Sequence, residues 1–182
     1  MGKNHPFFFA LSAQEKTEVA LRFANEDALA VKKLCDKGEY QLGENHCGKF
    51  QEQFRRAIRW MERAREEGKD IEALIEKLKE NHLRQQRVLA GVLEKMPQQA
   101  KGGLLNAIEN SCFGLENAIE RIQGKQKMEQ FQEELNLQIM NMDEGTRLQI
   151  QKRLKEKVTG PKEVPEANQQ MQKHNQPNPG KK

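Results

Sequence analysis

Histidine and cysteine stand side by side at one point of the chain, His46-Cys47, inside the stretch GENHCGKF at positions 43–50. Both side chains can bind metal ions, and a thiolate beside an imidazole can also react. Adjacent residues on a helix point about 100° apart, whereas two helical ligands of one ion stand three or four positions apart. We therefore interpret Cys47 as a small buried residue of a helix core, not as half of a metal site.

The chain contains three cysteines, Cys35, Cys47 and Cys112, and no C-x-x-C spacing. If a helical hairpin turns near Gly38, Cys35 and Cys47 differ by about 8 Å along the hairpin axis. The sideways separation of packed helices adds to this offset. Because the Cα atoms of a disulfide lie within about 7 Å of each other, we expect no bond between Cys35 and Cys47.

Apolar positions with a spacing of three and four residues run through most of the chain, which is typical of amphipathic α-helices. Ser12 with Glu15 has the pattern of a capping box and predicts the start of the first helix. Gly38 predicts its end. A second row of apolar positions begins at Tyr40 and continues to the break at Gly68.

Further helices follow after Asp70, which has the residue type of an N-cap. Pro97 predicts the end of the third helix and the start of the fourth, because proline stops a helix and is favoured in a first turn. The fourth helix breaks at Gly124, and two shorter helical patterns follow it, separated by residues 143–145. Short links between helices make each helix antiparallel to the next.

One site-like pair emerges from this arrangement. Folding the third and fourth helices about Pro97 places Cys112 opposite His82, at a level about 22 Å from the end of the bundle. An imidazole and a thiol in contact can bind a metal or react, but two ligands do not complete a zinc site. We predict a buried polar pair and no bound metal or cofactor. Metal or redox sensing through His82 and Cys112, with Cys47 contributing, is the alternative.

Composition favours thin amphipathic helices, because hydrophobic residues make up 36%, aromatic residues 5% and charged residues 32% of the chain. The net charge of +4 comes from 31 Lys and Arg against 27 Asp and Glu, which are interleaved along the sequence. A nucleic-acid module concentrates its cations on one face, so this pattern indicates a solvated surface instead. No apolar run approaches the roughly 20 residues of a membrane span.

We predict an all-α fold, either an antiparallel four-helix bundle or an extended array of helical hairpins, with one or two extra C-terminal helices. The expected divisions are an N-terminal segment at 1–11, a helical bundle at 12–123, C-terminal helices at 124–158 and a tail at 159–182. The C-terminal helices are expected to pack on the bundle or to project as an arm. The tail is rich in Pro, Gln and Asn, so we predict disorder there.

One basic segment, 147–157, carries five basic residues and one acidic residue on an amphipathic pattern. Such a helix can make weak contact with an anionic membrane surface or bind nucleic acid. It has no aromatic anchor, and cations near a helix C-terminus are favourable without any partner. The candidate partner-binding residues are Arg147, Lys152, Arg153 and Lys155.

Four runs of the chain together resemble a bacterial family of exported, all-helical domains of unknown function. That family has an N-P-F-Y-like start, a FAEERLAE-like first helix and a VLEKVPEQAK-like junction. The similar runs here are KTEVALRFANED (16–27), KGEY (37–40), REEGKDIEAL (65–74) and VLEKMPQQAK (92–101), and NHPFFF (4–9) resembles the family's first segment. The similarity spans residues 6–122, and the junction at 92–101 is its most specific part.

The resemblance implies an all-helical domain outside the cytoplasm, with no established activity and no catalytic or binding residues to carry over. Residues 1–9 lack the pattern of a signal peptide, because three Phe are too few for its apolar core, so a cytoplasmic location is the alternative. The sequence shows no acid–base or nucleophile constellation, which argues against an enzyme. We predict a non-enzymatic structural or protein-interaction module that binds a protein partner or a second copy of itself.

Overall fold

The computed structural model describes residues 11–159, with side chains described as far as residue 155. This part of the chain confirms the predicted all-α fold. The N-terminal segment and the tail predicted at the two ends lie largely outside the described residues. Six α-helices make up the described part: α1 (Ala13–Cys35), α2 (Tyr40–Glu66), α3 (Glu72–Leu93), α4 (Gly102–Gln123), α5 (Lys125–Met140) and α6 (Glu144–Thr159).

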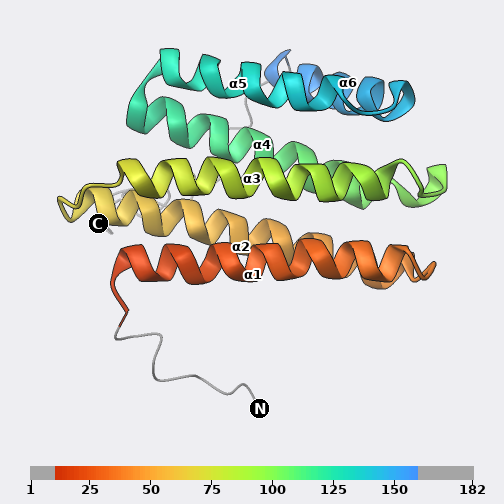
Figure 1. The fold of residues 1–182 in the computed structure, drawn as a ribbon, viewed down its shortest axis with the longest axis horizontal. Helices are drawn as coiled ribbons and strands as arrows, with labels where there is room; N and C mark the ends of the chain where they lie inside the picture. Colours follow the sequence, from red (N-terminus) through yellow and green to blue (C-terminus); the bar gives the residue numbers. More distant parts are fainter. Residues whose placement is uncertain (1–10, 160–182) are drawn as a thin grey trace, which may run out of the picture.

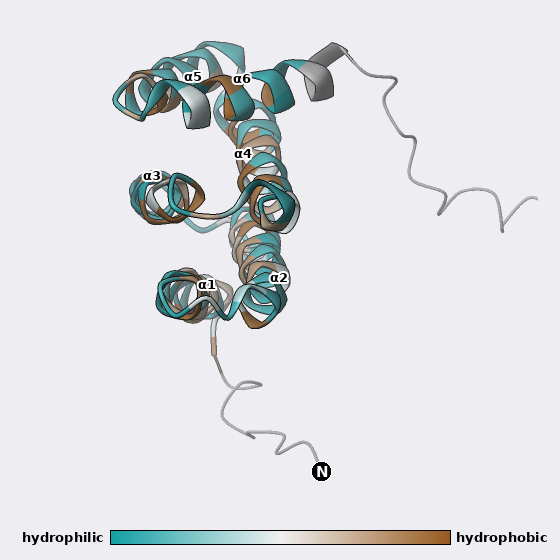
Figure 2. Ribbon diagram, turned by 90° about the vertical axis from the view of Figure 1, so that its right-hand side faces the viewer, coloured by the Kyte–Doolittle hydropathy of each residue, from teal (hydrophilic) through white to brown (hydrophobic). Residues whose placement is uncertain are grey.

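The helices form three hairpins, stacked one above the next (Figure 1). The first hairpin is α1–α2, the second α3–α4 and the third α5–α6. Viewed end-on, α1, α3 and α5 form one layer, and α2, α4 and α6 form the other (Figure 2). The fold is therefore an extended array of helical hairpins, whose first two hairpins together make a square of four helices.

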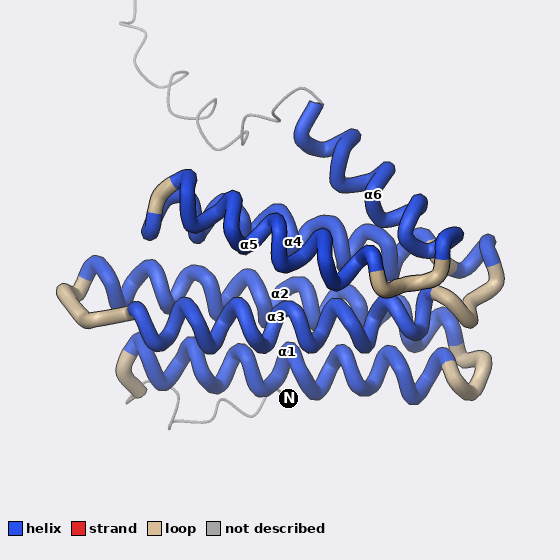
Figure 3. The backbone as a smooth tube through the Cα atoms, turned by 45° about the horizontal axis from the view of Figure 1, so that its top comes forward, coloured by secondary structure: helices blue, strands red, loops and turns tan. Residues whose placement is uncertain are grey.

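The third hairpin packs on the second through α5 and through one side of α6, where Ile150 and Leu154 lie against Leu105 and Ile108 of α4. The amide of Gln138 on α5 donates to the carbonyl of Leu83 on α3 at 2.8 Å, and Gln132 on α5 donates to the Glu116 carboxylate on α4 at 3.2 Å. Beyond its first turns α6 runs at an angle to the other helices (Figure 3). Residues 124–155 therefore lie on the array and do not project as a free arm.

Side chains and glycines set the helix ends where the sequence predicts them. The Ser12 hydroxyl accepts from the backbone N–H of Glu15 at 3.2 Å, and the Glu15 carboxylate accepts from the backbone N–H of Ser12 at 2.8 Å. The Asp70 carboxylate accepts from the first backbone N–H of α3, that of Glu72, at 3.0 Å. The link between α1 and α2 contains Gly38 with φ +78, a left-handed conformation that favours glycine.

The links around α4 differ from those expected. The third link of the chain is expected to turn sharply at Pro97, but residues 94–101 separate α3 from α4 and include a 3₁₀ helix, Gln98–Ala100. In contrast, Gly124 alone joins α4 to α5, with φ +89. The proline ends the helical run without opening α4, so α4 starts several residues later than its position alone indicates.

Small residues allow close packing within the first hairpin. Ala20, Ala24 and Ala28 lie on the buried face of α1 and are almost fully enclosed. On α2, a Cβ added to Gly43 would lie 2.7 Å from the sulfur of Cys35, a distance that real side chains do not tolerate. Gly43, the first glycine of GENHCGKF, therefore lies where the end of α1 passes close to α2, and a side chain there requires the Cys35 sulfur to move.

Candidate functional site

A polar cluster lies inside the array, between α3 and α4. The amide nitrogen of Gln86 donates to the Nε2 atom of His82 at 3.0 Å and to the Ser111 hydroxyl at 2.8 Å. Ser111 in turn donates to the backbone of its own helix, with the carbonyl oxygen of Ala107 at 2.8 Å. These groups form a single chain of hydrogen bonds from α3 to α4, and all three cluster side chains are buried.

Aromatic rings enclose His82 on both sides. Its ring centroid lies 4.9 Å from that of Phe54 on α2 and 5.8 Å from that of Phe131 on α5. Burial away from water disfavours the imidazolium and lowers the pKa of His82 to about 3. Because Nε2 accepts from Gln86, the neutral ring carries its proton on Nδ1.

Several polar atoms of this cluster lack a hydrogen-bond partner within the described part of the chain. They are His82 Nδ1, Gln86 Oε1 and both amide atoms of Gln85, which is also fully buried. Gln85 and Gln86 are three and four residues beyond His82, so all three share the buried side of α3. The place of His82 and Gln85 in the apolar row of α3 is visible in the sequence, but the hydrogen bond from Gln86 to Ser111 depends on how α4 packs against α3.

The sequence places His82 opposite Cys112, and both residues are fully buried. The hydrogen bond that crosses this hairpin joins Gln86 to Ser111. Among the described residues, the hydrogen-bond partner of His82 is Gln86, and its ring contacts are Phe54 and Phe131. The predicted pair of His82 and Cys112 stays a prediction.

The three cysteines are buried and unpaired. Burial, with the nearby charges of Cys35 and Glu44, raises the pKa of the Cys47 thiol to about 12, and burial raises that of Cys112 well above its ordinary value. A thiol held in this way is a poor nucleophile and a poor metal ligand at neutral pH. Within residues 11–155, no three His, Cys, Asp or Glu side chains gather closely enough to hold a metal ion.

His46 turns away from its neighbour Cys47 and crosses to α1. Its Nδ1 atom lies 2.7 Å from a carboxylate oxygen of Asp27, in a half-buried position on the first hairpin. The sequence places His46 on a different face of the helix from Cys47 but does not identify this partner. The only sequence signal for this contact is Asp27, an acidic residue on α1 at about the same distance as His46 from the turn at Gly38.

The four basic candidates of α6 are not equivalent. Arg153 faces α4, where its guanidinium lies 3.8 Å from the Glu109 carboxylate. Lys152 and Lys155 are exposed, and Arg147 is partly buried. The proposed contact of this helix with anionic surfaces or nucleic acid stays a prediction.

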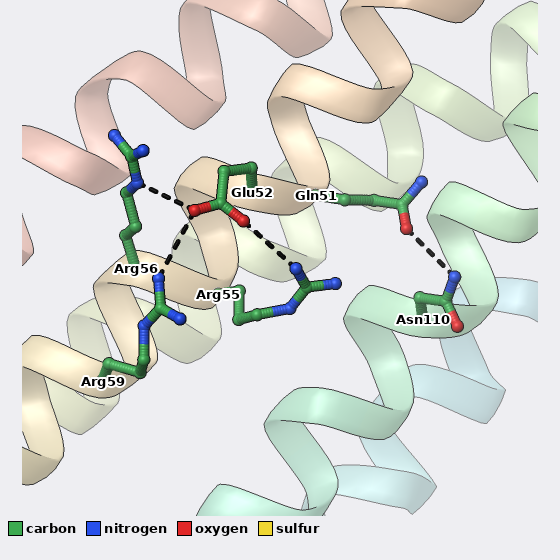
Figure 4. Close-up of polar contacts among 6 residues, drawn as sticks. All are labelled: Gln51, Glu52, Arg55, Arg56, Arg59 and Asn110. Carbon is green, nitrogen blue, oxygen red and sulfur yellow. Dashed lines mark hydrogen bonds and ion pairs between the residues drawn. The ribbon is translucent and has the colours of Figure 1, made fainter. Parts of the chain in front are cut away.

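A cluster of arginines surrounds Glu52 on α2, and one of them, Arg55, extends toward α4 (Figure 4). The Glu52 carboxylate accepts from Arg55 at 3.1 Å, from Arg56 at 2.9 Å and from Arg59 at 3.4 Å. Three guanidinium groups offer many more donors than one carboxylate can accept. The cluster therefore carries an excess of positive charge at a surface that is about half exposed.

A small hollow lies between α2 and α4, beside Arg55. It has a volume of about 50 Å³ and is lined by Gln51, Phe54, Arg55, Ile58, Asn110, Ser111 and Gly114. Across its rim, the amide of Asn110 donates to Gln51 at 3.0 Å, and Figure 4 shows Arg55 extended on that same side of α2. Ser111 belongs to the internal cluster as well, so the hollow and the chain of hydrogen bonds to His82 share one residue.

Large apolar side chains that are exposed in the described chain occur only on the first and last hairpins. They are Phe23, Leu29, Leu42, Leu137, Met140 and Leu148. The middle hairpin, with a neighbour on each side, has none. Among the residues whose side chains are described, the exposed large apolar side chains thus lie on the two hairpins that end the stack.

Comparisons of the chain with family models, with curated proteins and with solved structures find no match. The family resemblance and the location that it implies therefore stay predictions. Within the described residues, no helix combines the length and the hydropathy needed to cross a bilayer.

Proposed function

We propose that this protein is a non-enzymatic helical module that binds a second copy of itself through the open end of α5–α6. The observation that carries the proposal is the apolar surface at this end. Leu137 and Met140 on α5, and Leu148 on α6, are 68%, 56% and 55% exposed. Helices that stack by their faces leave one unsatisfied face at each end of the array.

The spacing along both helices supports an outward-facing surface. Leu137 is two residues from both Leu135 and Ile139, which are buried, and two residues correspond to the opposite side of a helix. Leu148 stands in the same relation to Thr146 and Ile150, which are also buried. Leu137 and Leu148 therefore point away from the core, where another helix pair can cover them.

Charges on the same two faces favour a second copy over an unrelated helix. Glu133 is four residues before Leu137 on the outward face of α5, and Lys152 is four residues after Leu148 on that of α6. In a two-fold symmetric pair, α5 of one copy lies against α6 of the other. The Glu133 carboxylate of each copy then lies near the Lys152 ammonium of the other copy. The apolar residues Leu137 and Leu148 meet between these two ion pairs.

The surroundings of the most reactive residues support a role without catalysis. His82, Cys47 and Cys112 are enclosed in the core. The His46–Asp27 pair is closer to the surface, but among the described residues its ring has no hydrogen bond to a hydroxyl or thiol that it could activate. General base catalysis needs such a neighbour or a bound substrate.

Analytical ultracentrifugation of the full chain over a range of concentrations tests the proposal. We expect a monomer–dimer equilibrium that the double substitution Leu137→Gln with Leu148→Gln shifts to the monomer. The matched control, Leu29→Gln with Leu42→Gln, changes residues of similar exposure, 48% and 51%, on the opposite end of the stack. This control should dimerise as the unmodified chain does.

A charge exchange tests the symmetric arrangement itself. Glu133→Lys alone and Lys152→Glu alone should each weaken the dimer, and the two together should restore it, because the pair is exchanged between the copies. A chain that stays monomeric at every concentration contradicts the proposal. So does a dimer that the control substitutions disrupt, since the opposite end would then be the interface.

A further inference from the structure

We propose that the hollow between α2 and α4 is a second binding site, which takes the carboxylate side chain of an acidic segment of a partner protein. The site combines the arginine cluster around Glu52 with the depression beside Arg55. It is separate from the α5–α6 surface, and the proposal does not depend on self-association.

The lining combines an apolar floor with a cation at the rim, so an acidic side chain that lies across the hollow can pack its methylene groups on the floor with its carboxylate turned to Arg55. Phe54 and Ile58 are buried and form an apolar floor. Arg55 stands at the rim, and the Gln51–Asn110 hydrogen bond spans the other side. A volume of about 50 Å³ accommodates about three water-sized groups, comparable to the methylenes of Asp or Glu.

Arg55 has donors left for a ligand. Its Nη1 atom binds Glu52 at 3.1 Å, which leaves the other side of the guanidinium open for a second carboxylate. The planar guanidinium binds a carboxylate through two parallel hydrogen bonds, a geometry that holds a ligand more firmly than a point charge does. Glu52 thus fixes the position of Arg55 at the rim without neutralising the cluster.

The pattern of charge along α2 favours an acidic peptide over a nucleic acid. Arg55 extends toward the hollow, and Arg59 stands on the other side of Glu52, so the cations form a compact group on α2 (Figure 4). Glu52 interrupts the cluster and repels a continuous phosphate backbone. The residues lining the hollow include no exposed aromatic ring on which a base could stack, since Phe54 is buried.

Gly114 makes the hollow testable without any change of charge. It lines the depression on α4, and a Cβ added there would lie 3.6 Å from the Cδ1 atom of Ile58, an ordinary contact. Gly114→Ala therefore reduces the space, keeps the fold and favours the helix. Melting followed by circular dichroism should show a midpoint equal to or higher than that of the unmodified chain.

The test measures fluorescence anisotropy of a labelled oligo-glutamate peptide with the full chain, and of the matching oligo-glutamine peptide. We expect binding of the glutamate peptide alone. Arg55→Gln and Gly114→Ala should each weaken it about tenfold, the effect of losing one good charged hydrogen bond. The control Arg87→Gln removes the same charge from the exposed side of α3 and should leave the affinity within about twofold.

Three results overturn the proposal. The first is an undiminished affinity of Gly114→Ala, because binding would then depend on charge and not on the hollow. The second is an equal loss with Arg55→Gln and Arg87→Gln. The third is competition by single-stranded oligo-uridylate, or by inorganic phosphate, at the same concentration as free oligo-glutamate, which would mark a general anion surface.

Discussion

The Nδ1 atom of His46 lies 2.7 Å from a carboxylate oxygen of Asp27, so the two helices of the first hairpin are joined by a polar contact as well as by their apolar faces. Both side chains are less than a third exposed. The hydrogen bond therefore contributes more to stability than most surface pairs do.

Replacement of either partner should destabilise the first hairpin. We expect Asp27→Asn and His46→Gln each to lower the free energy of unfolding by about 1 kcal/mol at pH 7. The double substitution should lower the free energy of unfolding by less than the sum of the two single effects. Once one partner of the hydrogen bond has been replaced, replacement of the other removes no further interaction. Urea unfolding of the four proteins measures this coupling, and strict additivity would show that the contact does not form.

The enclosed His82 predicts a loss of stability in acid. Its pKa is about 3 in the folded chain and about 6.5 in the unfolded chain. The unfolded state therefore binds the proton first, and the stability present above pH 6.5 falls as the pH drops toward 3. The loss between pH 6.5 and pH 4.5 should be about 2–3 kcal/mol from this residue.

Carboxylates titrate over part of the same range, so the measurement needs a variant without the imidazole. We compare the pH dependence of unfolding of the unmodified protein with that of the His82→Leu variant. Leucine fills the space between Phe54 and Phe131 with an apolar side chain that does not titrate. The difference in the free energy of unfolding between the two proteins should change by about 2–3 kcal/mol between pH 6.5 and pH 4.5. Parallel curves would mean that His82 is hydrated and titrates normally in the folded protein.

Two glycines of α2 should respond oppositely to the same substitution. A Cβ at Gly43 would lie 2.7 Å from the sulfur of Cys35, whereas nothing lies within 4 Å of one at Gly48. We expect Gly43→Ala to destabilise the protein by about 1–3 kcal/mol. Gly48→Ala should stabilise it by about 0.5–1 kcal/mol, because alanine loses less conformational entropy on folding than glycine and has the higher helix propensity.

Thermal unfolding of both variants tests this pair. Cys35→Ala removes the obstructing sulfur, so it should recover part of the loss caused by Gly43→Ala. A Gly43→Ala protein as stable as Gly48→Ala would show that the end of α1 does not press on α2.

The thiols should react slowly while the protein is folded. Because burial raises the pKa of Cys47 to about 12, its thiolate fraction at pH 8 is lower than that of a free cysteine by on the order of a thousandfold. Cys35, at 8% exposure, should react first. Titration with a chromogenic disulfide, with and without zinc, measures the rates. Protection by zinc would instead favour metal sensing through His82, Cys112 and Cys47.

The sequence predicts most of the helices because their ends carry local signals. Ser12 with Glu15 and Asp70 mark helix starts through side-chain caps, and Gly38 marks an end through its left-handed backbone. Such signals depend on a few neighbouring residues, so a single sequence is enough to find them. The buried row of α2 follows the apolar spacing for the same reason.

Contacts between helices depend on register, and register depends on links that local signals describe poorly. Pro97 predicts a sharp turn, but the link extends over residues 94–101 and includes the 3₁₀ helix Gln98–Ala100. The hydrogen bond from Gln86 to Ser111 depends on how α4 packs against α3, which no local signal describes. The contact of His82 with Phe131 was likewise beyond reach, since it depends on how α5 folds back over α3.

Phe131 belongs to the last hairpin, and its ring covers one side of an imidazole that belongs to the hairpin before it. Any opening of the stack at that point admits water to His82 and restores its ordinary basicity. Separation of the final hairpin and uptake of one proton are therefore thermodynamically linked. Mild acidity should loosen the end of the array before the rest of the molecule.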